Sequence, residues 1–134
     1  GLGIGFDEPH GSSESAGIRL DERAFEAASP PRTVLVSSAA GAVGSLVGQL
    51  ARLRGCHVIG LCGSEEKARA LTDQLGFHGA VNYKASPAQL RESIRAALPV
   101  GRTSVDVFWD SVGGELSHLI VSELVAAGGQ GVLC

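Results

Sequence analysis

The feature that most constrains the fold of this chain is a glycine-rich turn between a buried strand and a helix. The turn is Ala40-Gly41-Ala42-Val43-Gly44. The run before it, residues 33–37, is β-branched and apolar without a break, which is typical of a strand buried on both faces. The run after it predicts a helix over residues 42–54 that ends at Gly55. Spacings of three and four predict that one apolar face of this helix packs on a sheet, formed by Val43, Leu46, Val47, Leu50 and Leu53.

The same alternation of strand and helix repeats along the chain. Further strands are expected over residues 57–62, 80–82, 105–110 and 131–134, and further helices over residues 64–75, 87–98 and 115–125. Strands separated by helices of this length predict an α/β fold with a doubly wound parallel sheet of the Rossmann type, with about five strands. Because a complete dinucleotide fold has one more βα step, we expect the domain to be truncated after its fifth strand.

The first part of the chain differs from this pattern. Residues 1–31 are rich in Gly, Ser, Pro and Glu and hold one weak helical stretch, residues 20–28. We interpret residues 1–31 as a leader or linker and residues 32–134 as the partial nucleotide-binding domain.

Size, charge and cysteine content limit the kinds of partner. A chain of 134 residues with 44% apolar residues is expected to form one domain. Its net charge of -3 argues against a nucleic acid or an anionic membrane, and its apolar runs are far shorter than the roughly 18 residues of a membrane span. We therefore expect a cytoplasmic protein with a small-molecule partner and leave an oligomer open. Cys56, Cys62 and Cys134 lack metal-ligand spacing, so we expect buried thiols and no metal site.

The glycine turn is a candidate site for a pyrophosphate. Gly41 is expected to take the tight turn, and Gly44 to let the helix pack closely on the strand. The amides of Ala42, Val43 and Gly44 would then face outward at a helix N-terminus, which attracts anions. The motif departs from G-x-G-x-x-G at Ala39, and a purely structural strand-to-helix turn remains the alternative.

The end of the second predicted strand indicates which dinucleotide is bound. A site for NAD places Asp or Glu there, whereas this chain has Gly63 and Ser64, which leave room for a 2′-phosphate. Ser64 is also a good N-cap, which explains it without a ligand. A cation at Lys67, in the first helical turn, is locally unfavourable, so a 2′-phosphate nearby would compensate it. The alternative is that Glu65 and Glu66 neutralise it.

Two more strand ends carry candidate residues. Tyr83 follows the third strand and is either an ordinary amphipathic side chain or a contact of the adenosine end of the cofactor. Asp110 and the glycines after it close the fourth strand at the edge where ligands bind in such sheets. A turn formed by Asp110 is a sufficient structural account of that loop.

Taken together, several motifs in register resemble one family. The runs are VSSAAGAVGSLVGQ (36–49), RGC (54–56), CGSEEK (62–67), LGF (75–77), NYK (82–84) and DSVGG (110–114). Over residues 33–134 the chain is similar to the zinc-free prostaglandin reductase and leukotriene B4 12-hydroxydehydrogenase branch of the medium-chain dehydrogenase/reductase superfamily. Residues 1–31 do not resemble the segment that precedes this domain in the family.

The resemblance implies a cofactor and a reaction. It implies that NADP(H) is bound, with Gly41 to Gly44 on the pyrophosphate and Lys67 and Tyr83 on the 2′-phosphate. Ser111 stands where the family usually has Asn beside the cofactor, which puts that contact in doubt. The implied activity of the parent protein is metal-free reduction by NADPH of the double bond in α,β-unsaturated ketones and aldehydes, such as 15-oxo-prostaglandin-like enones, or of quinones. Hydride would reach the β-carbon and a proton the α-carbon.

The catalytic residues are left unknown, because the substrate domain of the family is not in this chain. A truncated module that binds NADP(H) without turnover is the main alternative, and a zinc alcohol dehydrogenase with its metal elsewhere is a third. A short-chain dehydrogenase is excluded because the only tyrosine has Pro87 four residues on, where that class needs Lys. A P-loop NTPase is excluded because no Gly-Lys-Ser/Thr follows the glycines.

Overall fold

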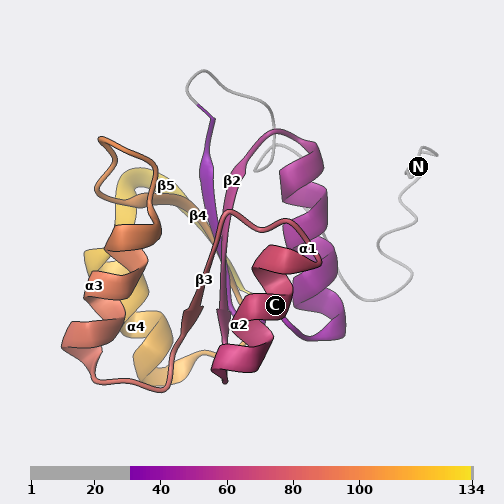
Figure 1. Cartoon of the computed structure of the whole chain (residues 1–134). Coiled ribbons are helices and arrows are strands. Elements are labelled where there is room, and N and C mark those ends of the chain that lie inside the picture. Colours follow the sequence, from indigo (N-terminus) through magenta and orange to yellow (C-terminus); the bar gives the residue numbers. More distant parts are fainter. Residues whose placement is uncertain (1–30, 134) are drawn as a thin grey trace.

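The computed structural model describes residues 31–133, and these form a parallel sheet with helices on both faces (Figure 1). The strand order is β3-β2-β1-β4-β5. The strands are β1 (Thr33–Val36), β2 (His57–Cys62), β3 (Gly79–Asn82), β4 (Val105–Asp110) and β5 (Val125–Leu133). The helices are α1 (Ala42–Leu53), α2 (Glu65–Asp73), α3 (Pro87–Ala97) and α4 (Gly114–Glu123). The predicted doubly wound parallel sheet is confirmed. The leader or linker and its weak helix lie outside the described residues, except Pro31.

Each face of the sheet carries its own apolar core. Successive side chains of a strand point to opposite faces, and the four residues of β1 are all buried. Val34 and Val36 therefore join the core beneath α1 and α2, while Leu35 joins the core beneath α3 and α4. Figure 1 shows α1 and α2 on one side of the sheet and α3 and α4 on the other. The direction of winding changes between β1 and β4, which is the switch point where ligands bind in such sheets.

The face that α1 turns to the sheet differs from the predicted one. Small residues form it, since Gly44, Val47, Gly48 and Ala51 are the buried residues of this helix. Of the five predicted apolar residues only Val47 is fully buried, while Leu46 and Leu53 are 53% and 73% exposed. The prediction was wrong because two glycines and an alanine bring the helix axis closer to the sheet than leucines would allow.

Phe77 fills the space that these small residues leave. Its ring is 4% exposed and packs between α1 and β2. A Cβ at Gly48 would overlap the ring, with Cε2 only 2.7 Å away, and a Cβ at Gly60 would lie 3.0 Å from Cδ2. Both glycines are thus needed for close packing around one aromatic side chain.

The chain enters β5 earlier than predicted. Helix α4 ends at Glu123, and Val125 already pairs with Val105 of β4. The predicted helix to residue 125 and the predicted strand start at residue 131 are both corrected. The register then shifts, and regular pairing resumes between Val107 and Gln130. Sequence periodicity misses this start because the glycine-rich residues 126–131 carry neither a helical nor a strand pattern, so pairing with β4 decides it.

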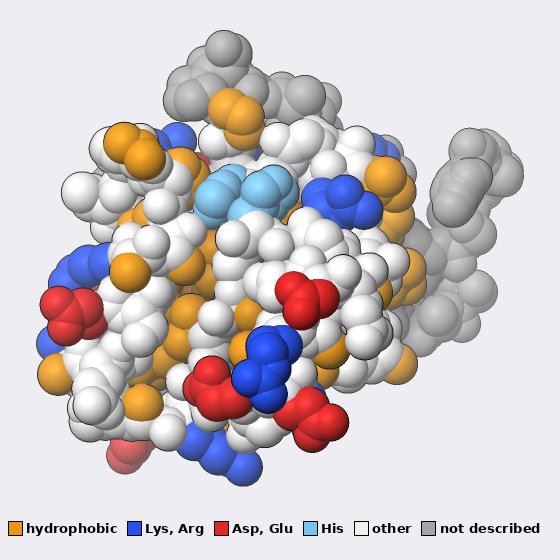
Figure 2. Space-filling view, viewed as in Figure 1, with side chains coloured by type: hydrophobic (Ala, Val, Ile, Leu, Met, Phe, Trp, Pro, Cys, Tyr) orange, Lys and Arg blue, Asp and Glu red, His pale blue; other side chains and the backbone are white. Residues whose placement is uncertain are grey.

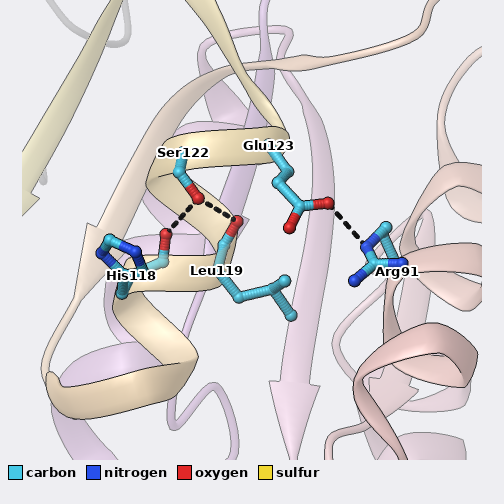
Figure 3. Close-up of polar contacts among 5 residues, drawn as sticks. All are labelled: Arg91, His118, Leu119, Ser122 and Glu123. Atoms are coloured by element: carbon cyan, nitrogen blue, oxygen red, sulfur yellow. Dashed lines mark hydrogen bonds and ion pairs between the residues drawn. The ribbon is translucent and has the colours of Figure 1, made fainter.

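Helices α3 and α4 are joined across the same face by an ion pair. Arg91 Nε lies 2.7 Å from Glu123 Oε1, and both side chains are partly exposed (Figure 3). In the last turns of α4, Ser122 Oγ donates to the carbonyl of His118 at 2.7 Å. A partly exposed pair of this kind contributes up to about 1 kcal/mol, so it orients the two helices more than it stabilises the fold.

Two stacked histidines join β2 and β3 where these strands begin. The rings of His57 and His78 have centroids 4.7 Å apart, and two imidazoles lie side by side on the surface in Figure 2. The Nδ1 atom of His78 accepts a hydrogen bond from the amide of Val58 at 3.0 Å, which requires that this nitrogen carry no proton. Partial burial of the ring, and then the charges of His57 and Arg52, lower the pKa of His78 below its usual 6.5.

The lowered pKa of His78 predicts a loss of stability in mild acid. The unfolded chain binds a proton at His78 more readily than the folded chain does. The contribution of neutral His78 to the free energy of unfolding is therefore present above about pH 6.5 and is lost as the pH falls below that value. We expect the urea concentration at the unfolding midpoint to decrease as the pH is lowered from about 7.5 to about 5. His78→Asn keeps an acceptor near the position of Nδ1 without a titrating group, and this variant should show a flatter pH dependence.

His118→Asn is the matched control, since it changes an exposed histidine of α4 away from this pair. It should keep the wild-type pH dependence. An equal slope in wild type and His78→Asn would show that His78 is not the titrating group.

Candidate cofactor-binding site

The turn after β1 is held to two neighbouring strands by its backbone. Ser37 N donates to Trp109 O of β4 at 3.0 Å, and Ala39 N donates to Leu61 O of β2 at 2.9 Å. Ser38 between them has φ +49°, a left-handed conformation that is uncommon for a residue with a side chain. The expectation that Gly41 takes the tight turn is therefore corrected, because Gly41 has φ -78° and ψ 173°, which any residue adopts.

The two glycines of the motif have different reasons to be glycine. A Cβ at Gly44 would overlap the carbonyl oxygen of Ser38 and lie 3.0 Å from Ala39 Cα, so the packing of α1 on the turn excludes a side chain there. Gly41 is exposed, and a Cβ there would lie 3.3 Å from the Ser38 oxygen, which is tight but not prohibitive. The fold thus requires Gly44 and only favours Gly41.

The beginning of α1 presents its amides at the carboxyl edge of the sheet, at the lower edge of Figure 1. Gly41 is the N-cap and offers no side chain to the amides of Ala42, Val43 and Gly44. By contrast, α2 and α3 are capped by Ser64 and Ser86. Unsatisfied amides and the helix dipole make the start of α1 suited to an anionic group.

The end of β2 carries no acidic side chain. Gly63 follows the strand directly, and Ser64 Oγ accepts a hydrogen bond from Lys67 N at 3.1 Å. Ser64 therefore serves as the N-cap that the sequence predicts. The side chain of Lys67 is exposed in the first turn of α2, next to Glu65 and Glu66.

Two side chains from the turn after β3 lie over Gly63. An ideal Cβ at Gly63 would be 3.4 Å from Tyr83 Oη, 3.5 Å from Lys84 Cε and 3.7 Å from Lys84 Nζ. Tyr83 is the predicted residue, whereas Lys84 was missed as a site residue although it belongs to the NYK motif. The pairing of Cys62 with Asn82 brings the two strand ends together, and only knowledge of this register would have shown that Lys84 reaches position 63.

The loop after β4 is ordered by a buried carboxylate. Asp110 is 4% exposed, and its Oδ1 accepts hydrogen bonds from the amides of Val112 at 2.9 Å and Gly113 at 3.0 Å. Burial alone would raise the pKa of Asp110, but the hydrogen bonds from Ser117, Gly113 and Val112 outweigh it and lower the pKa. Asp110 is thus explained by its turn.

Ser111, at which the resemblance puts a cofactor contact in doubt, is fixed beside the turn after β1. Its amide donates to Ser37 Oγ at 2.8 Å, and the two hydroxyl oxygens are 3.4 Å apart. The side chain is exposed at the same edge of the sheet. The predicted residues therefore follow the carboxyl ends of β1, β2, β3 and β4, with Lys67 in the first turn of α2. The turns after β1 and β3 are hydrogen-bonded to neighbouring strands, and the loop after β4 is hydrogen-bonded to the turn after β1.

The cysteines and the other possible metal ligands of the described residues form no reactive or metal-binding site. Cys56 and Cys62 are buried thiols, as predicted, and burial is the main cause that raises the pKa of each, whereas Cys134 lies outside the described residues. Within residues 31–133 no three His, Cys, Asp or Glu side chains are grouped so that they could hold a metal ion. None of the helices in that range is long and apolar enough to cross a membrane.

A parallel sheet with a glycine turn and an uncapped helix at its switch point defines a Rossmann-type nucleotide-binding fold. Residues 42–134 match the model of a family described as zinc-binding dehydrogenase. The chain belongs to the medium-chain dehydrogenase/reductase superfamily, in the branch that contains prostaglandin reductase 1. It is 48% identical over 96 residues to prostaglandin reductase 1 of Mus musculus. The aligned region covers 72% of this chain and 28% of that relative. The protein of the same name from Bos taurus is 48% identical over 92 residues.

Solved structures show the same fold. CurA from Vibrio vulnificus in complex with NADPH is 36% identical and has a TM-score of 0.68 over 78% of this chain and 29% of that one. The CurK enoyl reductase is 26% identical, with a TM-score of 0.64 over 77% of this chain and 29% of that one. The present chain thus spans less than a third of the length of these relatives.

Proposed function

We propose that this chain forms the NADP(H)-binding part of a reductase that uses NADPH to reduce the carbon–carbon double bond of α,β-unsaturated ketones and aldehydes. The observation that carries the proposal is Gly63. An NAD site has a carboxylate side chain at this position, whereas Gly63 has no side chain. The hydroxyl of Tyr83 and the ammonium group of Lys84 border the space that this leaves. The names of the relatives, prostaglandin reductase 1 and an enoyl reductase, support the reaction class.

The residues present fit the cofactor at both phosphate positions. The uncapped amides of Ala42, Val43 and Gly44 would hold the pyrophosphate, and the exposed Gly41 lets it approach the backbone. The donors above Gly63 would hold the 2′-phosphate. NADPH supplies a hydride when bound, and the role of this chain is to bind and orient it.

Replacing Gly63 with aspartate tests the choice of cofactor. The nearest atoms to an ideal Cβ lie at ordinary contact distances, so the side chain fits, but its charge would repel a 2′-phosphate and suit free ribose hydroxyls. We expect NADPH to bind at least about tenfold more weakly while NADH binding is kept or improved. Fluorescence titration of the reduced cofactors measures both.

Val100→Asp is the matched control, because it adds the same charge at a fully exposed residue before β4, at the opposite edge of the sheet. It should leave both affinities unchanged. Equal weakening of both cofactors by Gly63→Asp, or a wild type that prefers NADH, would contradict the proposal.

A module that binds NADP(H) without turnover is the alternative that the sequence analysis leaves open. Incubating the chain with NADPH and an enone separates the two. Binding of NADPH with no loss of its fluorescence would favour the module, and oxidation that depends on the enone would favour a reductase active in this chain.

A further inference from the structure

We propose that Ser37 is a positioning residue that aims the hydroxyl of Ser111, as a hydrogen-bond donor, at the nicotinamide half of the cofactor. The inference rests on the proposed function and concerns a buried residue outside the predicted candidates. Ser37 follows β1 and Ser111 follows β4, the two strands between which the direction of winding changes. Their side chains therefore meet at the switch point, where a dinucleotide crosses from one half of the sheet to the other.

The two hydroxyls differ in their access to solvent. Ser37 is 0% exposed, whereas Ser111 is exposed at the carboxyl edge of the sheet. Ser37 Oγ accepts a hydrogen bond from Ser111 N at 2.8 Å and lies 3.4 Å from Ser111 Oγ. Among the described residues, Ser111 Oγ is the one acceptor within hydrogen-bond distance of the Ser37 hydroxyl. Because a buried hydroxyl needs a partner, Ser37 donates its proton and Ser111 Oγ accepts it.

This direction decides what Ser111 can offer a ligand. Its oxygen receives the proton of Ser37, so its own proton points away from Ser37 and toward the exposed side of the loop. The separation of 3.4 Å is long for a pair of hydroxyls, so this hydrogen bond is weak and sets a direction more than it adds stability. Ser111 is thus presented as a donor, which suits an acceptor oxygen of the cofactor.

The loop after β4 is held so that it presents this side chain and not its backbone. The amides of residues 111–113 are all engaged, the first by Ser37 Oγ and the next two by Asp110 Oδ1. Ser37 N in turn donates to Trp109 O at 3.0 Å, which fixes Ser37 itself against β4. Little order is therefore lost when the hydroxyl of Ser111 binds a ligand.

The place of Ser111 in the sheet indicates which half of the cofactor it meets. A doubly wound dinucleotide fold has two mononucleotide-binding halves, and β4 begins the second. Gly63 and Tyr83 follow β2 and β3, on the other side of β1 from Ser111. Ser111 is therefore remote from the proposed position of the 2′-phosphate, and its loss should affect NADPH and NADH equally.

The variant Ser37→Ala tests the inference in the full 134-residue chain. We expect it to weaken the binding of both NADPH and NADH by about 3- to 10-fold, the effect of one neutral hydrogen bond. Binding of 2′,5′-ADP, which carries the adenosine half alone, should stay unchanged. Isothermal calorimetry measures all three affinities without turnover. If Ser37 only supported the site as a whole, 2′,5′-ADP would bind more weakly too.

Thr33→Val is the matched control, because it removes another buried hydroxyl from the opposite end of the same strand. Thr33 Oγ1 has no hydrogen-bond partner among the described residues, so no contact of the site depends on it. This variant should keep the wild-type affinity for all three ligands.

Two variants of the exposed Ser111 keep the test independent of how well Ser37→Ala folds. Ser111→Thr keeps the hydroxyl and should retain most of the affinity for NADPH. Ser111→Val has the same shape without the hydroxyl and should bind about 3- to 10-fold more weakly. In the Ser111→Val background, adding Ser37→Ala should cost less than about twofold, because the hydroxyl that Ser37 aims is already gone.

Three results would overturn the inference while the proposed function stands. They are equal affinities of Ser111→Thr and Ser111→Val for NADPH, an additive loss in the double variant, and weaker binding of 2′,5′-ADP by Ser37→Ala. A wild type that binds neither NADPH nor NADH would overturn both the inference and the proposed function.

Discussion

Replacing Gly44 with alanine is expected to destabilise the protein by about 3 kcal/mol, at the upper end of what an added methyl group costs in a packed site. The new Cβ would overlap the carbonyl oxygen of Ser38, and the carbonyl carbon lies only 2.9 Å from it. These are backbone atoms of a turn hydrogen-bonded to β2 and β4, so neither the turn nor α1 can yield without loss of sheet contacts. Urea unfolding followed by circular dichroism measures the loss.

Gly41→Ala is the matched control, since it adds the same methyl group three residues earlier. The backbone of Gly41 suits any residue, and we expect its replacement to change the free energy of unfolding by less than about 1 kcal/mol. Gly41→Ala should weaken cofactor binding more than Gly44→Ala does, because Gly41 is exposed where the cofactor would approach. Equal stability of the two variants would show that α1 does not need its close approach to the turn.

The second large effect is expected at Gly48, where alanine should cost about 2 to 3 kcal/mol. The obstacle here is the ring of Phe77, which is wedged against Gly60 and cannot withdraw. Because the obstacle is a side chain, it can be removed. Phe77→Leu alone should destabilise the protein, but in its presence Gly48→Ala should cost at least about 1 kcal/mol less than in the wild type. A double-mutant cycle in urea measures this coupling.

Leu90→Ala provides the control pair, because Leu90 belongs to the core on the opposite face of the sheet. Its effect should add to that of Gly48→Ala without coupling. An additive result for Gly48→Ala and Phe77→Leu as well would mean that the ring adapts to the extra methyl group.

The sequence predicts most elements of this fold because their signals are local. Strands β2 and β4 have the predicted bounds, since each is an apolar run between clear turn or helix signals. The start of α3 at Pro87 is as predicted, since proline suits the first position of a helix, and the structure adds Ser86 as its N-cap. The face of α1 was predicted wrongly because a count of apolar residues does not reveal how near a helix stands to a sheet. That distance depends on Phe77, a residue from another part of the chain.

Some residues of the candidate site can likewise be predicted from the sequence, and others cannot. The glycine turn, Gly63 and Tyr83 are visible in the sequence because each follows a predicted strand. The left-handed Ser38 is not, since its conformation is imposed by hydrogen bonds from its two neighbours to separate strands. The approach of Lys84 to Gly63 is also invisible, because it depends on the register of β2 and β3, across 21 positions of sequence.

The backbone bonds that tie the turns to neighbouring strands have a consequence for folding. Ser37 N donates to β4, Ala39 N donates to β2, and Tyr83 N joins the ends of β2 and β3, so the turns after β1 and β3 are not complete before those strands have paired. These contacts join segments far apart in the chain, and such contacts form late in folding. Ligand binding would therefore report the fully folded population alone, and a ligand that binds only this state would pull marginally stable variants toward it by mass action.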